Sequence, residues 1–559
     1  MLGPAGRRLI GSLEAGGTGG GTPGYLPRFR RLVAAERGSG WWCYGGPVIA
    51  RAAPMFALAL AALSGCRAPA PPQTTPVSPV GVVATPRAGA CKDTSCRTWA
   101  AILLSGGRDR EDNVVAHERN VAFASRSLVA RGVMTAEQTV LFADGDDTEA
   151  DLQVEEPDHD RWLLLYSIGL LRGGDDARTA VLRYRDHVVP GAKRGDHAAV
   201  LQALADDARG AVAAPRRDLF LYVTDHGLEQ PDRTNNLIVL WGRRDLSVRE
   251  LGAALDAQPP ARRVVTVMAQ CFSGSFSALV HEAGDPKRSL AIHDRCGFFA
   301  APADRPAAGC SPKSDESLYD DYTTRFFAAL GGKDRAGAPI PTADLDGDGR
   351  VSLEEAHLWA VVHEATQDVP VTSSEELLRR SRPAWVAEAK ADERPIGEHL
   401  AHARPTVRVA AQRLLASIGL DASVSIRSLR RLAGEIRASD RVARAEERAR
   451  VARQAAHAAL AREAGGTPLP DGPAGLALVV LGHARVSAWR DGARPALDAS
   501  LAAEAEAERA RVDVEEREAR HLRLARLAEL SLLERRAETT DAPLARDAAR
   551  VRSCEATTM

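Results

Sequence analysis

DLFLYVTDHG (218–227) and ARRVVTVMAQCFSG (261–274) each contain an apolar run rich in β-branched or aromatic residues and end in polar or small residues. Such runs are typical of buried strands in a parallel sheet. The helical pattern between them, SVRELGAALDAQ (247–258), supplies the crossover that two parallel strands need. His226 and Cys271 follow their strands at the same relative place, so we expect both side chains at the carboxyl edge of one sheet.

The chain on either side of these two strands continues the alternation of strands and helices. The other expected strands lie at 99–107, 139–144 and 296–302, and the other expected helices lie at 117–132, at 197–212 and near 321–330. This alternation predicts an α/β fold with a mostly parallel sheet flanked by helices.

After about residue 400 the composition shifts to Ala, Glu, Arg and Leu. The pattern predicts two long helices, at 440–463 and 501–536, separated by the Gly- and Pro-rich segment 465–475. We expect an all-α helical hairpin or a coiled coil that is available for association with itself or a partner. Acidic and basic residues are interleaved and the net charge is -1, so nucleic acid is not an expected partner.

The N-terminal part contains a candidate export signal. MFALALAAL (55–63) is too short to span a bilayer but suits the apolar core of a secretory leader. Ser64-Gly65-Cys66 after it resembles a bacterial lipoprotein site, in which Cys66 is acylated and anchors the chain to the membrane of the cell envelope. A short buried helix that ends in an ordinary cysteine is the alternative.

These features divide the chain into four parts. We expect residues 1–65 to form a leader region with a true start near 48–55, and 66–97 to form a Pro/Thr-rich tether. Residues 98–395 form the α/β domain, and 396–559 form the helical C-terminal region.

Cysteine usage agrees with export into an oxidising compartment. Close spacing makes Cys91–Cys96 and Cys296–Cys310 candidates for disulfides. Cys271 and Cys554 are then left unpaired.

Cys271 and His226 are the candidate catalytic residues. A thiolate is an effective nucleophile, and a histidine can activate it and then protonate the leaving amine. Gly227 and Gly274 follow these residues closely, which lets a substrate backbone approach and leaves amides to bind an oxyanion. A buried structural cysteine is the competing interpretation of the same spacing.

The segment from Trp99 to about Leu330 resembles the legumain-like cysteine peptidases, a branch of the caspase-like (clan CD) fold. The resemblance rests on TDHG (224–227), on the C-x-S-G of 271–274 and on FFAAPADRPAAGC (298–310). It implies that Cys271 is the nucleophile, that His226 is its partner, and that the amides of Gly227 and Cys271 form the oxyanion hole.

Two departures from this family concern the primary specificity pocket. Relatives that cleave after Asn carry an acidic residue two positions before the nucleophile, where this chain has Ala269. They also carry Arg before a His near the first strand, where this chain has Ala116 before His117. We therefore expect a pocket for a small or apolar side chain and no asparaginyl specificity.

DLDGDGRVSLEE (344–355) matches an EF-hand calcium loop. The expected ligands are the side chains of Asp344, Asp346, Asp348 and Glu355 and the backbone carbonyl of Arg350. Because one loop is evident and EF-hands normally pair, we expect a structural calcium site rather than a switch. An acidic surface turn is the alternative interpretation.

Together these patterns predict an exported, lipid-anchored cysteine endopeptidase acting on protein or peptide substrates. The alternatives are a non-catalytic envelope lipoprotein that uses both regions for protein binding, and a transpeptidase working through the same Cys–His pair. The sequence contains neither a phosphate-binding loop nor a dinucleotide fingerprint, so no organic cofactor is expected.

Overall fold

A computed structural model of the chain describes residues 97–172, 177–214, 216–309, 312, 319–465 and 483–559. All of these residues belong to one compact unit. The predicted leader, tether and lipidation site at Cys66 lie outside the described residues, as do Cys91, Cys96 and Cys310.

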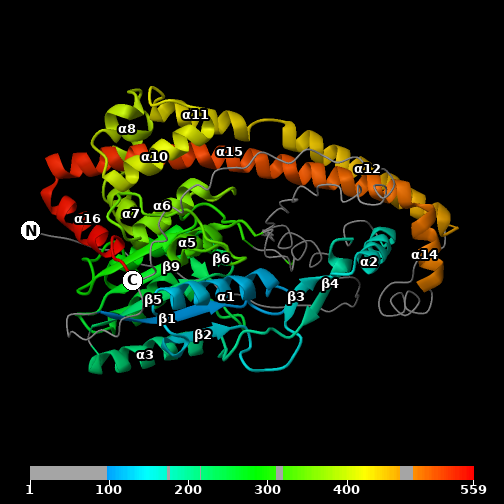
Figure 1. The fold of residues 1–559 in the computed structure, drawn as a ribbon, viewed down its shortest axis with the longest axis horizontal. Coiled ribbons are helices and arrows are strands. Elements are labelled where there is room, and N and C mark those ends of the chain that lie inside the picture. The colour runs from blue at the N-terminus through cyan, green and yellow to red at the C-terminus, as the bar shows by residue number, and fades with distance from the viewer. Residues whose placement is uncertain (1–96, 173–176, 215, 310–311, 313–318, 466–482) are drawn as a thin grey trace, which may run out of the picture. The chain divides into compact units, whose positions relative to one another are not determined.

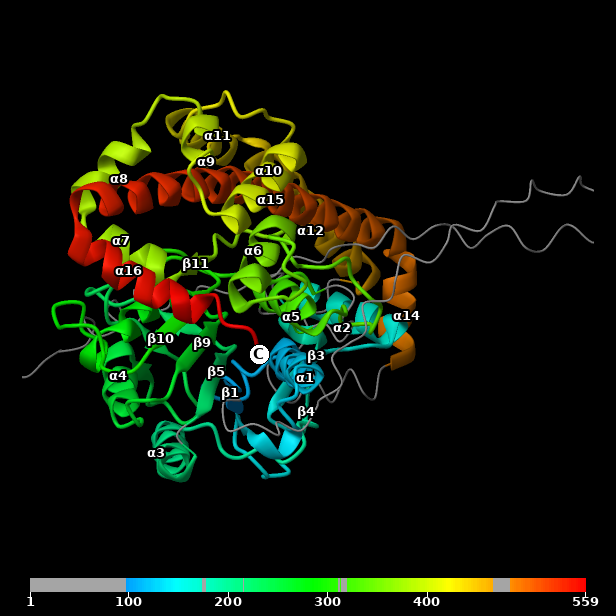
Figure 2. The ribbon, with the colours of Figure 1, turned by 60° about the vertical axis from the view of Figure 1, so that its left-hand side comes forward.

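The core of the α/β part is a six-stranded sheet in the order β11-β10-β9-β5-β1-β2 (Figures 1 and 2). Its strands are β1 (Thr98–Ser105), β2 (Gln138–Phe142), β5 (Arg217–Val223), β9 (Val264–Met268), β10 (Arg295–Phe299) and β11 (Val371–Thr372). All neighbours pair in parallel except β10 and β11, which are antiparallel. The predicted α/β class, its mostly parallel sheet and the five predicted strands are confirmed.

Helices cover both faces of this sheet because β1 is apolar on both faces. Trp99, Ala101 and Leu103 belong to one core cluster, together with side chains of α1 and α5. Ile102 and Leu104 point the other way, as alternate residues of a strand must, into a second cluster with α3 and α4 (Figure 2). These helices are α1 (Val115–Ala130), α3 (His197–Ala213), α4 (Val248–Asp256) and α5 (Tyr322–Gly331).

Two small antiparallel sheets and one helix of the α/β part add to the five predicted strands and their helices. They are the hairpin of β3 (Leu152–Glu155) and β4 (Leu182–Arg185), the three-stranded sheet of β6 (Gly227–Leu228), β7 (Leu237–Ile238) and β8 (Leu246–Ser247), and α2 (His159–Leu171). Their strands have two to four residues, too few for a periodic pattern to be recognised.

The C-terminal region is helical, as predicted. Its elements are α9 (Ile396–Leu400), α10 (Pro405–Ile418), α11 (Ile426–Arg437), α12 (Arg441–Glu463), α14 (His483–Gly492), α15 (Arg494–Thr540) and α16 (Ala542–Glu555). Three further helices precede this region, in the part predicted as the α/β domain: α6 (Leu353–His363), α7 (Ser373–Ser381) and α8 (Pro383–Lys390). The two long helices, α12 and the 47-residue α15, lie side by side (Figure 1). None of the described helices is long and apolar enough to cross a membrane.

The helical region is attached to the α/β part by buried polar contacts. The Arg523 guanidinium of α15 is 1% exposed and donates to the backbone carbonyls of Glu364, Thr366 and Asp368 at 2.7–2.8 Å. At the far end of the long helices, the Tyr166 hydroxyl of α2 donates to the Glu504 carboxylate of α15. A buried guanidinium is stable only where carbonyl or carboxylate oxygens satisfy its donors, so α15 is held in one position on the 361–368 segment.

One disulfide also joins the two regions, because Cys296 on β10 is bonded to Cys554 on α16. The predicted pairing of Cys296 with Cys310, and the prediction that Cys554 is unpaired, are therefore wrong. Short spacing favoured Cys310, whereas the packing of α16 against β10 brings together two cysteines separated by 258 positions.

Beside this disulfide, Glu555 makes stability depend on pH. Its carboxylate is fully buried and accepts the backbone amide and the hydroxyl of Ser374 at 2.7 and 2.6 Å. Burial raises the pKa of Glu555 from 4.5 to about 8, and the Ser374 hydrogen bonds oppose this only in part. The Glu555 carboxyl group therefore binds its proton more tightly in the folded protein than in the unfolded chain.

We expect the contribution of Glu555 to the free energy of unfolding to be largest below pH 4.5 and to be lost as the pH rises to about 8. Glu555→Gln keeps the shape of the side chain and removes its charge. The denaturation midpoint of this variant should therefore fall less between pH 4.5 and about 8 than that of the wild type. The exposed Glu538→Gln is the control, and equal pH slopes for Glu555→Gln and the wild type would contradict the prediction.

Candidate active site

The register of β5 and β9 places the two candidate catalytic residues in segments that follow neighbouring strand ends. Val223 pairs with Met268 at the ends of these strands, and the Ala269 amide donates to the Val223 carbonyl at 2.8 Å. His226 and Cys271 each lie three residues beyond that pair. The prediction that they follow neighbouring strands at one carboxyl edge is confirmed.

Gly227 brings the two chain segments into direct contact. A Cβ atom at this position would collide with the carbonyl oxygen of Cys271, so no residue other than glycine fits here without movement of the backbone. Cys271 itself is followed by Phe272 in the left-handed conformation, at φ 59°, and by the 3₁₀ helix Ser273–Val280. Cys271 therefore lies on a sharp turn between strand and helix.

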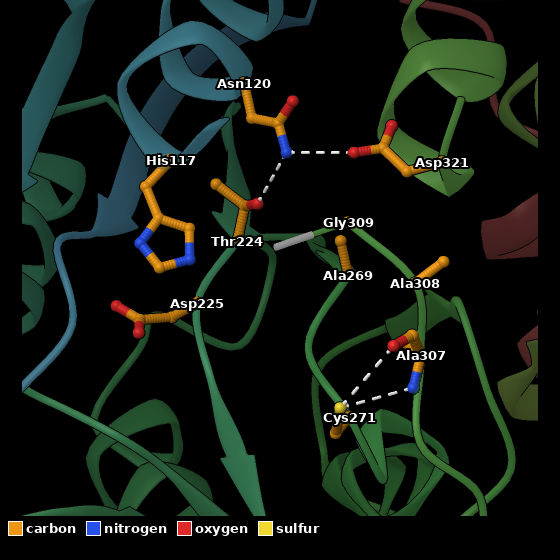
Figure 3. Close-up of a pocket in the computed structure, with 10 residues that line it drawn as sticks. All are labelled: His117, Asn120, Thr224, Asp225, Ala269, Cys271, Ala307, Ala308, Gly309 and Asp321. Carbon is orange, nitrogen blue, oxygen red and sulfur yellow. Dashed lines mark hydrogen bonds between the residues drawn. The ribbon is translucent and has the colours of Figure 1, made fainter. Parts of the chain in front are cut away.

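The Cys271 thiol is 7% exposed and lines a pocket. The amide of Ala307 donates to Sγ at 3.3 Å, and Sγ is 3.6 Å from the Ala307 carbonyl oxygen (Figure 3). The space not filled by atoms is about 260 Å³, including its open mouth. The lining residues are His117, Asn120, Thr224, Asp225, Ala269, Cys271, Ala307, Ala308, Gly309 and Asp321.

Two histidines lie near this pocket. His117, from the first turn of α1, lines it and contacts His226 edge to face, with ring centroids 5.1 Å apart. Burial, and then the nearby His226, lower the pKa of His117 well below its usual value. Both ring nitrogens of His117 are buried and have no hydrogen-bond partner among the described residues. His117 is therefore neutral at pH 7, with its ring beside the pocket.

The half-buried His226 has a defined tautomer. Its Nε2 lies 2.9 Å from the carbonyl oxygen of Asp112, which can only accept a hydrogen bond. Nε2 therefore carries the proton in the neutral ring, and Nδ1 is the unprotonated nitrogen.

Asp225 connects the loops that follow β1 and β5. Its carboxylate accepts the amides of Gly107 at 3.1 Å and of His226 at 2.7 Å. Burial raises the pKa of Asp225 to about 7, although the nearby His226 and the two amides lower it. The same carboxylate thus fixes the backbone on which His226 is carried.

Polar residues of helices α1 and α5 form another wall of the pocket. The Asn120 side-chain amide donates to the Thr224 hydroxyl and to the Asp321 carboxylate, both at 3.1 Å. Arg335 forms an ion pair with Asp321 at 3.5 Å, which compensates its charge. Asn120 and Asp321 were not predicted from the sequence, and no local motif marks them because tertiary packing alone brings them here.

Of the three residues predicted to form the specificity pocket, two line the pocket in the structure and one does not. Ala269 and His117 line the pocket. Ala116 is not among the lining residues, because it is buried in a small apolar cluster with Val114 and Tyr319.

The helical region supports the wall opposite His117. Asp368 accepts the Ala308 amide at 2.6 Å, and the backbone of Asp368 is held by Arg523 of α15. Glu518 of α15 forms an ion pair with Arg305 at 3.2 Å. The segment in contact with the Cys271 thiol is thus positioned by the C-terminal region.

The acidic loop 344–355 forms a separate cluster before α6. Carboxylate oxygens of Asp344, Asp346 and Glu355 lie within 4.8 Å of one another. Asp344 accepts the amides of Gly347 and Gly349, both of which have a left-handed φ, at 82° and 83°. The carboxylate oxygens of Asp344, Asp346 and Glu355 are hard ligands, so the residues present fit a calcium ion.

Asp348 and Arg350 lie in the same loop, where the Asp348 carboxylate accepts the Arg350 amide at 2.8 Å. Glu355 also forms a reciprocal capping box with Ser352 that begins α6. The sequence of the loop therefore fixes both the acidic cluster and the start of the helix.

Fold and site together define an α/β protein with a thiol and two histidines at the carboxyl edge of a parallel sheet. No family model and no curated protein matches the chain. Among solved structures, it is similar to a crystal structure of protein GSU0716 from Geobacter sulfurreducens, at 10% identity and a TM-score of 0.28. The similarity covers 49% of this chain and 92% of that one, and it identifies neither a fold family nor a function.

Proposed function

We propose that this chain is a cysteine endopeptidase whose sheet and site correspond to the legumain-like branch of the caspase-like fold. The observation that carries the proposal is the register of β5 and β9, which aligns His226 with Cys271 at one sheet edge. The pocket that reaches the Cys271 thiol supports it, because a substrate carbonyl needs access to the sulfur.

In the proposed reaction the Cys271 thiol gives its proton to Nδ1 of His226, and the sulfur attacks the substrate carbonyl carbon. The amides of Gly227 and Cys271 are the proposed donors to the oxyanion. The C–N bond then breaks, and the leaving amine takes the proton from His226. Water attacks the resulting thioester and gives a proton to His226, which returns it to the sulfur as the acid product leaves.

The lining of the pocket favours a small, uncharged side chain next to the cleaved bond. Ala269 and the segment from Ala307 to Gly309 leave little room, and the polar groups of Asn120 and Asp321 already bind each other. Arg335 compensates the Asp321 carboxylate, so a basic substrate side chain has no free charge to pair with there.

A peptide library offered to the full-length chain tests this proposal. We expect cleavage after Ala, Gly or Ser, with kcat/KM for Asn lower by at least about 10-fold, the scale at which a pocket discriminates by size. Mass spectrometry of the products, with and without an added amine, measures the preference and separates hydrolysis from transpeptidation. A sharp preference for Asn would contradict the pocket assignment, and no cleavage by the folded chain would contradict the peptidase.

We also propose that the loop 344–355 binds one calcium ion. Asp344, Asp346, Asp348 and Glu355 would hold it through carboxylates and Arg350 through its carbonyl, and the ion would neutralise clustered negative charge. The proximity of three of these carboxylates supports the assignment.

Millimolar calcium is expected to raise the melting temperature of the chelator-treated chain by several degrees, because a ligand that binds only the folded state stabilises it by about 2.7 kcal/mol at 100 times its Kd. Asp346→Asn should remove this shift, since Asp346 is exposed and its substitution disturbs little else. Glu538→Gln is the control and should retain it. An unchanged melting temperature for the wild type would contradict the calcium site.

The proposed location is the bacterial cell envelope, with a lipid anchor at Cys66. The Cys296–Cys554 disulfide supports export, because disulfides persist in oxidising compartments.

A further inference from the structure

A second group of potential metal ligands lies at the carboxyl edge of the sheet, away from the Cys271 pocket. Asp144 follows β2, Asp151 precedes β3, and His187 follows β4. One ligand atom of each lies within 4.8 Å of the others. Asp151 is 3% exposed and His187 is 9% exposed, so this group lies inside the protein and not on an acidic surface.

The two carboxylates in this group have unsatisfied oxygens. Oδ1 of Asp144 and Oδ1 of Asp151 are buried, and neither has a hydrogen-bond partner among the described residues. Oδ2 of Asp151 accepts the Asn113 side-chain amide at 3.2 Å. Buried oxygens without a donor are costly, and two neighbouring carboxylates also repel each other.

The raised pKa of Asp151 is consistent with the cost of burying two neighbouring carboxylates. Burial, followed by the charge of Asp144, raises the pKa of Asp151 to about 7. The nearby Arg185 is engaged elsewhere, in a bidentate pair with Glu118 at 3.0 and 2.7 Å. A cation between Asp144 and Asp151 would satisfy both free oxygens at once.

We propose that Asp144, Asp151 and His187 bind one divalent transition-metal ion of the zinc class. A histidine nitrogen combined with two carboxylates suits zinc, whereas calcium and magnesium prefer oxygen ligands alone. Because such bonds are about 2.0–2.2 Å long and zinc sites are tetrahedral, two ligand atoms of one ion are roughly 3.4 Å apart. The three ligand atoms lie within 4.8 Å of one another, so side-chain rotations would close them on an ion.

His187 Nε2 is the nitrogen that faces the group. It lies 3.9 Å from Asp144 Oδ1 and 2.8 Å from the carbonyl oxygen of Gly145. Metal binding moves the imidazole proton from Nε2 to Nδ1 and gives up a long contact of 3.3 Å between Nδ1 and the Val189 amide. The Gly145 carbonyl, released from Nε2, is then placed to be a fourth ligand.

The ion would tie three chain segments together, because its ligands lie at the end of β2, the start of β3 and the end of β4. It would hold the β3–β4 hairpin to the sheet. Asn113, which contacts Asp151, is adjacent to Asp112, whose carbonyl accepts the hydrogen bond from His226.

The test uses the full-length chain, stripped with chelator and returned to calcium buffer so that the loop 344–355 is saturated. Zn²⁺ is titrated by calorimetry, and Co²⁺ is added separately to record its visible absorption. We expect one Zn²⁺ per chain, a raised melting temperature, and a Co²⁺ spectrum of a nitrogen- and oxygen-ligated site. Asp151→Asn and His187→Gln should each weaken zinc binding at least ~100-fold.

Asp346→Asn, in the other acidic cluster, is the matched control and should bind Zn²⁺ like the wild type. Without metal, Asp151→Asn should melt no lower than the wild type, because a neutral amide of the same shape replaces a buried carboxyl that repels Asp144 when it is ionised. That result shows that the variant folds, so its loss of zinc binding reports on the site. The proposal is overturned if the wild type binds no stoichiometric Zn²⁺, if both site variants bind it unchanged, or if Asp346→Asn alone loses it.

Discussion

Replacing Cys271 with alanine is expected to lower peptide turnover by about 10⁴-fold or more, because the proposed reaction has no other atom to carry the acyl group. Stability should change little. The thiol accepts the Ala307 amide at 3.3 Å and lies 3.6 Å from the Ala307 carbonyl oxygen, and a hydrogen bond contributes about 1 kcal/mol. Turnover of the best library peptide, with the melting temperature measured in parallel, checks both parts.

The two histidines provide the matched comparison for this experiment. His226→Gln should lose turnover nearly as severely, because Nδ1 of His226 is the proposed proton carrier. His117→Gln should mainly raise KM, because His117 lines the pocket and is held neutral by burial. Loss of kcat in His117→Gln together with retention in His226→Gln would reverse the assignment, and an active Cys271→Ala would end the peptidase proposal.

The largest expected change in stability comes from the disulfide. The double variant Cys296→Ser, Cys554→Ser should lose roughly 3–5 kcal/mol of unfolding free energy, because the bond closes a very long loop in the unfolded chain. The two cysteines are 258 positions apart and both are buried, at 2% and 1% exposure. Urea denaturation of the variant and the oxidised wild type measures the difference.

Cys271→Ser is the control, because it also replaces a thiol with a hydroxyl but leaves the disulfide in place. It should unfold close to the wild type. If the double variant were as stable as the wild type, the connection between β10 and α16 would depend on packing alone.

The elements that could be predicted from the sequence are those with a continuous run of one class of residue. β1, β5 and β9 are continuous apolar runs, and α12 and α15 have uniform helix-forming composition, so each was recognised from its own residues. The placement of His226 beside Cys271 followed from topology, because consecutive parallel strands joined by one helix are usually neighbours.

The remaining features depend on contacts between distant segments. Asn120 and Asp321 meet across 201 positions, and Cys296 meets Cys554 across 258. Asp144, Asp151 and His187 come from three turns with no shared motif. Spacing along the chain carries no information on such encounters, which explains why the cysteine pairing was assigned to the wrong partner.

The bond between Cys296 and Cys554 also has a consequence for proteolytic maturation. A peptide-bond cut anywhere between these two residues would leave two fragments joined covalently. Such a nicked molecule would migrate as one species on a non-reducing gel and as two after reduction. A single internal cut therefore cannot release the C-terminal helices from the sheet.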